Sequence, residues 1–374
     1  MSPYYIGLMS GTSMDGVDGV LAEITPGSDQ ALRVLSHSHL RFDAALIGTM
    51  LGLNVRGENE LHRAALAAND LARRYSACVV ALLSSSGVDR RKVRAIGAHG
   101  QTVRHCPGEF DGTGYSIQLN APALLAESTA IDVICDFRSR DVAAGGQGAP
   151  LVPAFHGAMF GAIAPNMAVL NLGGIGNLTV LKGNRVAHGF DCGPANTLMD
   201  YWCQRHTGAR FDDRGAWARS GKTVPELVES MLNAPYFSLV PPKSTGRDLF
   251  NPQWLESNLQ VFGAAVPPED VQASLAELTA SACARDILRY APEARVLLVC
   301  GGGALNAYLM ERLSRHLPGI AVNTSDHYGL PATQVEACAF AWLAHAFLER
   351  QTVSHPSVTG ARGPRVLGAL YPAR

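Results

Sequence analysis

The sequence predicts an α/β protein made of two related domains, and two observations lead to that prediction. Apolar runs typical of strands alternate with longer segments in which apolar residues recur at helical spacing. A strand, a glycine-rich turn and a second strand occur near residue 11 and again near residue 173, as an internal duplication would produce. A chain of 374 residues also exceeds one typical core, since domains average roughly 150 residues. We expect domain I to comprise residues 1–137 with the tail 355–374, and domain II residues 138–354.

The charge balance argues against nucleic acid or an anionic membrane as the partner. The chain has 31 Lys and Arg against 32 Asp and Glu, so no basic surface large enough for polyanion binding is indicated. No basic segment followed by an apolar core opens the chain, and no stretch approaches the length of a membrane span. We therefore expect a cytoplasmic protein that binds a small molecule.

The eight cysteines are scattered without a Cys-x-x-Cys pair. Several lie inside apolar strand or helix patterns, which predicts reduced thiols in the core. His99, His105 and Cys106 lie near one another in sequence, but their spacing is not typical of a zinc site. We expect no zinc.

The first 42 residues are expected to form a meander of three strands at 4–10, 16–25 and 31–42. The turn between the first two strands is rich in glycine, and Gly11 and Gly16 tolerate positive φ, so successive N–H groups can converge on a phosphate. Strand-like flanks distinguish this turn from a Walker phosphate loop, which opens a helix. An ordinary tight turn has the same composition. The candidate phosphate-binding residues are Gly11, Thr12, Ser13, Met14, Asp15, Gly16, Val17 and Asp18.

A long amphipathic helix, other strands and a polar segment follow the meander. The helix is expected over residues 58–86, because apolar side chains recur there at helical spacing. The elements expected next are strands at 93–98, 115–119 and 131–135, with a short helix after Pro122. Residues 136–148 are polar and glycine-rich. This segment is either a linker passing beside a cleft or a solvated loop.

The second half repeats the opening pattern. Strands at 168–172 and 178–181 flank the turn 173–177, and a helix is expected after Asn196. Residues 208–270 give no clear pattern. The elements expected after them are a helix at 271–290, a buried strand at 295–300, a turn at 301–306 that opens a helix to about residue 316, and a last helix at 333–349.

Two further glycine turns are candidates for nucleotide binding. Backbone N–H groups must approach phosphate oxygens to about 3 Å, which favours glycine. The candidates are Gly173, Gly174, Gly176, Asn177, Gly301, Gly302, Gly303 and Asn306. A strand, Gly-x-Gly-x-x-Asn and helix, with Asp326 further on, also resembles a dinucleotide fingerprint. That alternative is a weak match, because Asn306 replaces the third glycine and fewer than eighty residues remain to complete a βαβ unit.

Asp191 is the candidate catalytic carboxylate. Phosphoryl transfer to a hydroxyl mainly requires positioning, charge neutralisation and a carboxylate near the nucleophile. Asp191 follows a strand-like run and precedes a Gly-Pro turn and a helix. Capping of that helix is the equally available alternative.

Five side chains are candidates for binding a substrate rich in hydroxyl groups, such as a sugar. They are His99, Gln101, Thr102, Arg138 and Glu336. The first three follow an apolar strand and offer donors and acceptors for hydroxyl groups, although a lone histidine is more often structural. Arg138 belongs to the polar segment, and Glu336 lies on the last helix beside an apolar face, where a solvated position is the alternative.

Six runs of the chain resemble the bacterial 1,6-anhydro-N-acetylmuramic acid kinases, in the same order and over nearly the whole length. These runs are residues 6–18 (IGLMSGTSMDGVD), 97–105 (GAHGQTVRH), 136–151 (DFRSRDVAAGGQGAPL), 171–177 (NLGGIGN), 190–196 (FDCGPAN) and 300–306 (CGGGALN). Cys192 and Ala195 depart from the family, which more often has Thr and Gly at these positions. The departure bears on the flexibility of the turn and not on the chemistry.

The resemblance implies the fold of the sugar kinase, actin and heat-shock chaperone superfamily, in which duplicated ribonuclease-H-like domains surround a central cleft. It implies ATP and Mg²⁺ as cofactors, with residues 11–18 on the ATP phosphates. It also implies that Asp191 is the base that activates water to open the anhydro bridge while O6 is phosphorylated. A cytoplasmic homodimer acting in cell-wall recycling is implied as well.

Three alternatives remain at this point. A kinase of the same fold could act on levoglucosan, which lacks the acetamido and lactyl groups. A non-catalytic actin-like protein could bind the nucleotide without turnover. A nicotinamide enzyme would instead use residues 301–306 for a dinucleotide.

Overall fold

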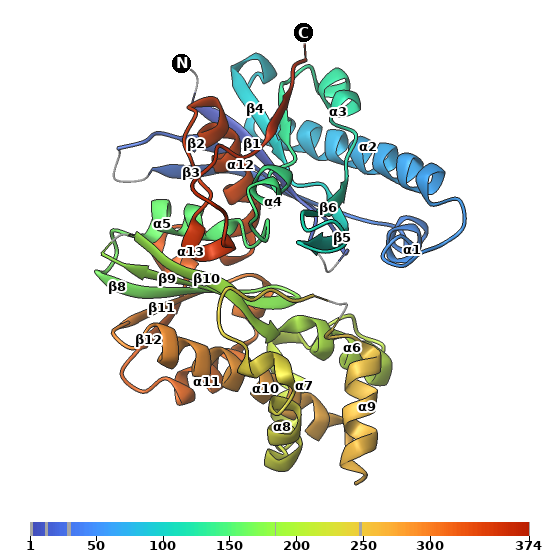
Figure 1. Ribbon diagram of the computed structural model, residues 1–374, viewed down its shortest axis with the longest axis vertical. Coiled ribbons are helices and arrows are strands. Elements are labelled where there is room, and N and C mark those ends of the chain that lie inside the picture. The colour runs from blue at the N-terminus through green and yellow to red at the C-terminus, as the bar shows by residue number, and fades with distance from the viewer. Residues whose placement is uncertain (1–2, 12–13, 28–30, 184, 247–248, 374) are drawn as a thin grey trace. The chain divides into compact units, whose positions relative to one another are not determined.

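The computed structural model describes residues 3–11, 14–27, 31–183, 185–246 and 249–373 (Figure 1). The chain divides into two compact units. Unit 1 comprises residues 1–155 and 334–374, and unit 2 comprises residues 156–333. Unit 1 is therefore built from two separate stretches of sequence.

Unit 1 contains a mixed sheet with the strand order β13-β7-β4-β1-β2-β3. Its strands in the described residues are β1 (Tyr4–Met9), β2 (Gly16–Ile24), β3 (Leu32–Arg41), β4 (Val93–Ala98), β7 (Val133–Cys135) and β13 (Ala369–Tyr371). The first three strands are antiparallel, β1, β4 and β7 are parallel, and β13 is antiparallel to β7. A separate hairpin pairs β5 (Gln101–Pro107) with β6 (Gly114–Leu119).

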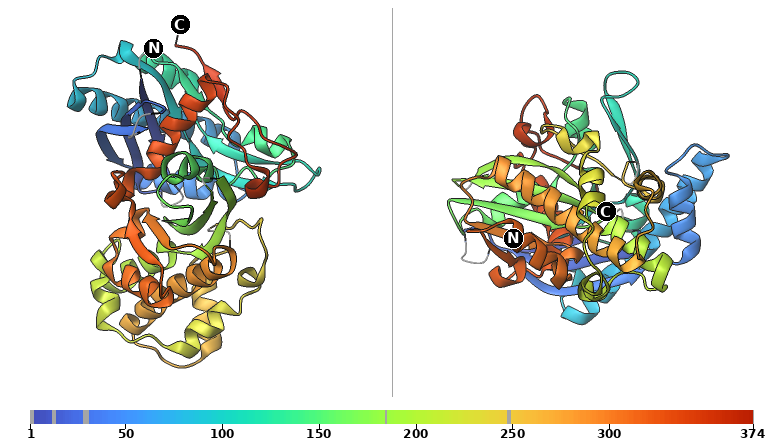
Figure 2. Two further views of the ribbon diagram at one scale, coloured as in Figure 1. Left: turned by 90° about the vertical axis from the view of Figure 1, so that its left-hand side faces the viewer. Right: turned by 90° about the horizontal axis from the view of Figure 1, so that it is seen from below.

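Helices α2 (Glu60–Ser86) and α12 (Val335–Leu348) cover opposite faces of this sheet. Side chains alternate between the two faces of a strand, so Ile6 and Leu8 of β1 pack in the core on the α2 side. Gly7, between them, faces α12, and an added Cβ there would lie 1.8 Å from the Ala337 carbonyl oxygen. Figure 2 shows α12, in red, alongside the sheet of unit 1. The absence of a side chain at Gly7 lets this helix approach the strand closely.

Local signals explain where α2 ends. Its C-cap, Gly87, has φ of 68°, and the Gly87 N–H donates to the Leu83 carbonyl, an arrangement that glycine favours because it has no Cβ. The other helices in the described residues of unit 1 are α1 (Ala44–Gly52), α3 (Pro122–Thr129), α4 (Ser139–Ala143) and α13 (Pro356–Thr359). Helix α5 (Val152–Phe160) contains the boundary between the units.

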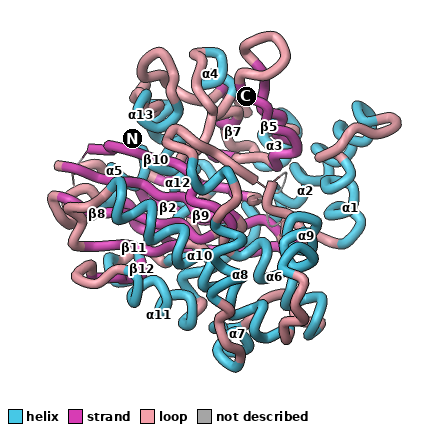
Figure 3. Tube along the Cα trace, turned by 60° about the horizontal axis from the view of Figure 1, so that its bottom comes forward, coloured by secondary structure: helices cyan, strands magenta, loops and turns pink. Residues whose placement is uncertain are grey.

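Unit 2 repeats the strand arrangement of unit 1, with the order β10-β9-β8-β11-β12 (Figure 3). Its strands in the described residues are β8 (Asn166–Leu172), β9 (Ile175–Lys182), β10 (Arg185–Pro194), β11 (Val296–Cys300) and β12 (Ala321–Thr324). Again three antiparallel strands are followed by two parallel ones. The predicted duplication is confirmed as a shared topology.

Helix α10 (Pro268–Tyr290) is the central helix of unit 2 and packs against β9, β10 and four other helices. Its interior consists largely of small and aliphatic side chains, which allow close packing on all sides. The remaining helices in the described residues of unit 2 are α6 (Asn196–Thr207), α7 (Ala216–Ser220), α8 (Pro225–Leu232), α9 (Pro252–Phe262) and α11 (Ala307–His316).

Several sequence expectations differ from the structure. Helix α1 and strand β5 were not expected, and the unassigned region 208–270 contains α7, α8 and α9. The turn at 301–306 opens a helix to His316 as expected, although the turn itself contains a 3-10 helix at Gly302–Leu305 before α11 begins at Ala307. Strands β11 and β12 are parallel and flank α11. A βαβ unit therefore does form there, although too few residues were expected to remain for one.

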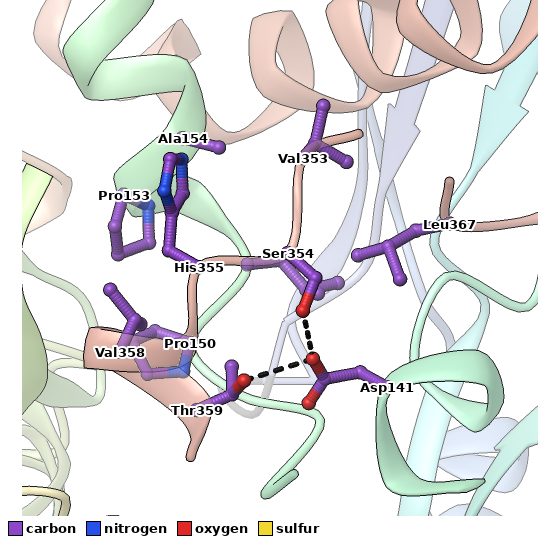
Figure 4. Close-up of a pocket in the computed structure, with 11 residues that line it drawn as sticks. Asp141, Pro150, Pro153, Ala154, Val353, Ser354, His355, Val358, Thr359 and Leu367 are labelled. Carbon is purple, nitrogen blue, oxygen red and sulfur yellow. Dashed lines mark hydrogen bonds between the residues drawn. The ribbon is translucent and has the colours of Figure 1, made fainter. Parts of the chain in front are cut away.

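The polar segment 136–148 folds into unit 1 and carries helix α4. Asp141 of this segment is fully buried. Its Oδ2 accepts a hydrogen bond from the Gly148 N–H at 2.8 Å, and its Oδ1 accepts bonds from the hydroxyls of Ser354 and of Thr359, the latter at 2.9 Å (Figure 4). These contacts tie the segment to the returning C-terminal stretch. They explain why both belong to unit 1, whereas a linker was one of the two interpretations of the sequence.

The chemistry of the cysteines agrees with the expectation from sequence. All eight are free thiols, and seven of them are buried. Among the described residues, no three or more His, Cys, Asp or Glu side chains are grouped so that they could hold a metal ion. No helix in the described part of the chain is long and apolar enough to span a membrane.

The close approach of α12 to β1 gives the first prediction. Replacing Gly7 with Ala should lower the free energy of unfolding by about 1–3 kcal/mol, because the new methyl group overlaps helix backbone that cannot move independently. Gly48→Ala is the matched control, since a Cβ at this exposed position of α1 meets no atom within 4 Å. Denaturant unfolding of both variants measures the difference. Equal stabilities for the two variants would contradict the packing described for Gly7.

Candidate functional site

Two glycine turns of unit 2 meet at the ends of neighbouring strands β8 and β11. A Cβ added to Gly301 would lie 2.5 Å from Asn171 Oδ1 and 2.7 Å from the Leu172 carbonyl oxygen. A Cβ added to Gly303 would lie 2.6 Å from Leu172 Cβ. Only glycine permits this backbone approach at both positions. The structure therefore brings the predicted residues 301–303 next to the turn that begins at Gly173.

The start of helix α6 fixes the orientation of the Gly173-Gly174 turn. The N–H of Asn196 donates to the Gly173 carbonyl at 3.0 Å, and the N–H of Ala195 donates to the Gly174 carbonyl at 3.0 Å. The Asn196 side chain also donates to the Leu172 carbonyl at 3.0 Å. In a trans peptide the N–H points opposite to the carbonyl. The N–H of Gly174 therefore points away from α6, as an anion-binding turn requires.

Asn306 has a different role from the one expected. Its Oδ1 accepts a hydrogen bond from the Leu309 N–H at 3.0 Å and so caps α11. This oxygen is committed to the helix. Gly302, by contrast, is exposed, whereas Gly301 and Gly303 are buried. Of the predicted third turn, Gly302 is thus the glycine that a ligand can reach from solvent.

Asp191 lies within strand β10, where it pairs with Asn177 of β9. Residues paired directly across antiparallel strands have side chains on the same face, so the sheet places two predicted site residues side by side. The Asp191 carboxylate is nearly buried, at 9% exposure. Its Oδ2 accepts a hydrogen bond from the Thr245 N–H at 2.9 Å. The main chain of Asp191 donates to the Lys243 carbonyl at 3.1 Å and accepts from the Tyr236 hydroxyl at 2.8 Å.

The alternative role of Asp191 as a helix cap is wrong. The N-cap of α6 is Ala195, and no side chain caps that helix end. Strand β10 continues to Pro194, so Asp191 precedes the helix by a further stretch of strand. The carboxylate is instead held by a loop segment that lies later in the sequence.

Two buried oxygen atoms beside Asp191 lack hydrogen-bond partners among the described residues. They are Oδ1 of Asn177 and Oγ1 of Thr245. Buried polar atoms are nearly always paired, and those that are not mark places where a water molecule or ligand binds. The face of the sheet that carries Asp191 therefore offers acceptors and a hydroxyl to a polar ligand.

Sequence reasoning missed Tyr236, Lys243 and Thr245, which form the surroundings of Asp191. They lie in the region 208–270, where no pattern of secondary structure was visible. The only signal was a Lys-Ser-Thr-Gly run directly after two prolines. Such a run is typical of an ordered loop, but it does not show which residue the loop contacts.

In unit 1, the residues predicted for the sugar hold the start of the glycine hairpin. His99 Nδ1 bonds to the Ser10 carbonyl at 3.0 Å, and Gln101 Nε2 donates to the Gly11 carbonyl at 3.1 Å. The Ser10 hydroxyl donates to the Gly100 carbonyl at 3.0 Å and lies 2.9 Å from the Tyr75 hydroxyl. These contacts fix the chain where β1 leads into the hairpin.

Both ring nitrogens of His99 have protein partners. Arg138 NH2 lies 2.9 Å from Nε2, and a guanidinium can only donate, so Nε2 is the acceptor and Nδ1 carries the proton. Burial, with Arg138 as a second cause, lowers the pKa of His99 to about 3. The imidazole is therefore neutral at physiological pH. A sugar hydroxyl could bond to this ring only by displacing Ser10 or Arg138.

The rest of the hairpin divides into core residues and exposed ones. The side chains of Met14 and Val17 are buried in the core, so only their main chains could meet a nucleotide. Asp15 is exposed at the start of β2. Asp18 Oδ1 lies 3.0 Å from His39 Nδ1 and 3.3 Å from His37 Nε2. Thr12 and Ser13, also predicted for the phosphates, lie outside the described residues.

The glycine at position 16 is required by its neighbours. A Cβ on Gly16 would lie 2.4 Å from the Leu40 carbonyl oxygen.

The other residues predicted for the sugar are Thr102, Arg138 and Glu336. Thr102 Oγ1 accepts from Gln118 Nε2 at 3.3 Å, and Arg138 NH1 donates to the Gly148 carbonyl at 2.7 Å. Glu336 is half-buried in the first turn of α12.

The strand order that both units share, with glycine turns at corresponding strand ends, defines the two-domain fold of sugar kinases and actin-like proteins. The family model described as anhydro-N-acetylmuramic acid kinase matches residues 3–373. The chain belongs to this family and is a kinase.

Curated relatives with this description match along their full length. The protein from Variovorax paradoxus is 57% identical over 99% of this chain and 99% of the relative. The protein from Cupriavidus metallidurans is 56% identical over 99% of this chain and 98% of the relative. A solved ROK family glucokinase from Streptomyces griseus, in complex with glucose and AMPPNP, is 13% identical with a TM-score of 0.43, covering 91% of this chain and 98% of that chain. This last likeness is too low to support an inference about the site.

The buried His99 gives a prediction about pH. Its pKa is about 3 in the folded protein and about 6.5 when unfolded, so between these values only the unfolded chain binds the proton. The contribution to stability is complete above pH 6.5 and decreases as the pH falls towards 3. Replacing His99 with Gln should remove about 2 kcal/mol of the stability difference between pH 7 and pH 5.

Unfolding by denaturant at pH 7 and at pH 5 measures the change in the free energy of unfolding between the two pH values. A loss of stability that is the same at both pH values does not affect this change. His62→Gln, at an exposed position of α2, is the control and should leave the pH dependence unchanged. A pH dependence in His99→Gln equal to that of the parent protein would contradict the neutral, buried imidazole.

Proposed function

We propose that this protein is an ATP-dependent kinase of 1,6-anhydro-N-acetylmuramic acid. The reaction opens the 1,6-anhydro bond with water and phosphorylates O6, which gives N-acetylmuramic acid 6-phosphate and ADP. Membership of the family over residues 3–373 supports the substrate. The observation that carries the chemistry is the placement of Asp191 on β10. Its Oδ2 is held by the Thr245 N–H, and it lies next to two buried oxygen atoms that have no hydrogen-bond partner in the described part of the chain.

In this proposal Asp191 is the general base. A carboxylate can remove a proton from water only when water reaches hydrogen-bond distance. Asn177 Oδ1 and Thr245 Oγ1 are buried without partners among the described residues, and they would orient such a water beside Asp191. The Thr245 N–H on Oδ2 fixes the orientation of the carboxylate.

Opening of the anhydro bridge and phosphorylation of O6 follow one another in the proposed reaction. The water oxygen forms a bond to the anomeric carbon while its proton moves to Asp191. The bond between the anomeric carbon and O6 breaks, and its electron pair remains on O6. O6 then forms a bond to the γ-phosphorus of ATP, and ADP leaves. Opening the bridge thus creates the phosphoryl acceptor, so one carboxylate acting on water serves both events.

The glycine turns are proposed to bind ATP. In unit 1 these are residues 11–18, and in unit 2 they are the turns at Gly173-Gly174 and at Gly302. Positioning and charge neutralisation dominate phosphoryl transfer, and backbone N–H groups such as that of Gly174 provide both without a charged side chain. Asn306 is expected to act only through α11, because its oxygen caps that helix.

Mg²⁺ is proposed to accompany ATP. The ion takes oxygen ligands and is commonly held by one or two carboxylates with substrate phosphates. The exposed carboxylate of Asp15 fits this donor chemistry. When bound, the ion offsets negative charge on the phosphate oxygens. We further propose that the enzyme is a cytoplasmic homodimer acting in cell-wall recycling, as expected from the family.

Replacing Asp191 with Asn tests the proposal. The rate of sugar phosphorylation should fall by about 10²- to 10⁴-fold, since the amide cannot accept the proton. ATP binding, measured by calorimetry, should be retained. Asp213→Asn, which changes an exposed carboxylate of unit 2, is the control and should be fully active.

Product analysis in ¹⁸O-labelled water supplies the second measurement. The label should appear at the anomeric carbon of the 6-phosphate product. Near-normal turnover in Asp191→Asn would remove this residue from the mechanism. Phosphorylation without incorporation of label would rule out coupled hydrolysis, and faster turnover of levoglucosan than of the muramic substrate would show that the substrate is wrong.

A further inference from the structure

We propose that Lys243 is a positioning residue for Asp191, and that its buried ion pair with Asp286 holds the loop that orients the catalytic carboxylate. The inference rests on the proposed role of Asp191 as the base. We call residues 243–245 the base-holding loop. Lys243 touches neither water nor sugar in this proposal, and it acts only through the geometry of Asp191.

The base-holding loop contacts Asp191 at two points. The Lys243 carbonyl accepts the Asp191 N–H at 3.1 Å, and the Thr245 N–H donates to Asp191 Oδ2 at 2.9 Å. Strand β10 is the edge of its sheet, so the loop supplies hydrogen bonds that no further strand provides. A shift of the loop would therefore move both the main chain and the carboxylate of Asp191.

The loop has little regular structure of its own. Residues 239–246 form neither helix nor strand, and Leu239 and Val240 are 51% and 61% exposed. Immediately after these exposed residues the chain turns inward at Lys243, whose side chain is only 2% exposed. The buried lysine side chain thus attaches this segment, which begins with exposed residues, to the interior of unit 2.

Three groups surround the Lys243 ammonium. Its Nζ lies 3.1 Å from Asp286 Oδ2 on helix α10, and it lies 5.5 Å and 5.1 Å from the ring centroids of Phe190 and Tyr236. Aromatic faces attract a cation at such distances. The lysine therefore connects the loop to the central helix of unit 2, to the residue before Asp191, and to the tyrosine that bonds the Asp191 carbonyl.

A buried charge pair needs a reason other than stability. Taking an ammonium and a carboxylate out of water is costly, and well-packed apolar residues often serve stability equally well. Burial raises the pKa of Asp286 despite the opposing effect of Lys243. What the pair supplies is an ionic contact of 3.1 Å between the base-holding loop and helix α10. Because the same loop bonds Asp191 through the Lys243 carbonyl and the Thr245 N–H, this contact serves the carboxylate.

The experiment must separate positioning from simple loss of folding. Lys243→Met alone leaves Asp286 buried without its partner, which can unfold the protein. The paired variant Lys243→Met/Asp286→Asn removes both charges together and avoids that penalty. Lys222→Met, at an exposed lysine of unit 2, is the matched control for the loss of a positive charge.

We expect the paired variant to lower kcat by about 10- to 100-fold, as small displacements of a catalytic group do. The KM for ATP and the ATP affinity measured by calorimetry should stay unchanged, because the lysine does not belong to the phosphate turns. Lys222→Met should match the parent protein in kcat. Equal kcat in the paired variant and the parent protein would overturn the inference.

The decisive measurement repeats the paired substitution in the Asp191→Asn protein. If Lys243 acts through Asp191, the residual rate should change by no more than about twofold, because the group being positioned is already disabled. A loss as large as that in the parent background would show a general structural effect and overturn the inference.

The proposed function can fail separately from this inference. Full activity in Asp191→Asn, or absence of the labelled 6-phosphate product from the parent protein, refutes the proposed function itself. A normal kcat for the paired variant beside an inactive Asp191→Asn refutes only the role of Lys243.

Discussion

The same constraint governs the first hairpin of each unit: its backbone carbonyls are bonded by groups from an element that comes later in the chain. In unit 1, His99 and Gln101 bond to the carbonyls of Ser10 and Gly11. In unit 2, main-chain N–H groups at the start of α6 donate to the carbonyls of the Gly173-Gly174 turn. Because every buried carbonyl needs a donor, these bonds decide which way each turn faces.

The two units use different groups to bond the hairpin carbonyls, although their strand order is the same. Unit 1 uses side chains, among them a histidine whose neutral state depends on burial and on Arg138. Unit 2 uses main-chain N–H groups at the start of α6, and its buried Lys243–Asp286 pair belongs to the surroundings of Asp191. The duplicated topology therefore supports two different local chemistries, one that fixes a hairpin and one that holds a carboxylate.

Much of the fold could be predicted from sequence, because it depends on periodicity and glycine. The long helix at 60–86 and the strand at 93–98 follow directly from the apolar pattern, as does the duplicated meander. Helix α4 could not be predicted in this way, since it is short and its central carboxylate, Asp141, is satisfied by residues more than two hundred positions away.

For the candidate site, the sequence indicated individual residues but not their contacts. Asp191 stood out by its place after a strand, but the loop that holds it has no periodic pattern, and only the folded chain brings Thr245 to its carboxylate. His99 was predicted to bind the sugar and Asn306 to bind the nucleotide. In the structure both side chains bond to the protein's own main chain, and such a contact leaves no trace in sequence spacing.

The discontinuous construction of unit 1 also has a consequence for biosynthesis. Strand β1 presents Gly7 to helix α12, and Asp141 receives two of its hydrogen bonds from residues 354 and 359. A ribosome makes the whole of residues 156–333 before any of these partners exists. Because domains fold as units during synthesis, unit 2 can complete its sheet before helix α12 has been made to cover one face of β1. Strand β1 therefore precedes the whole of unit 2 in the chain and yet is fully packed only after unit 2 has been made.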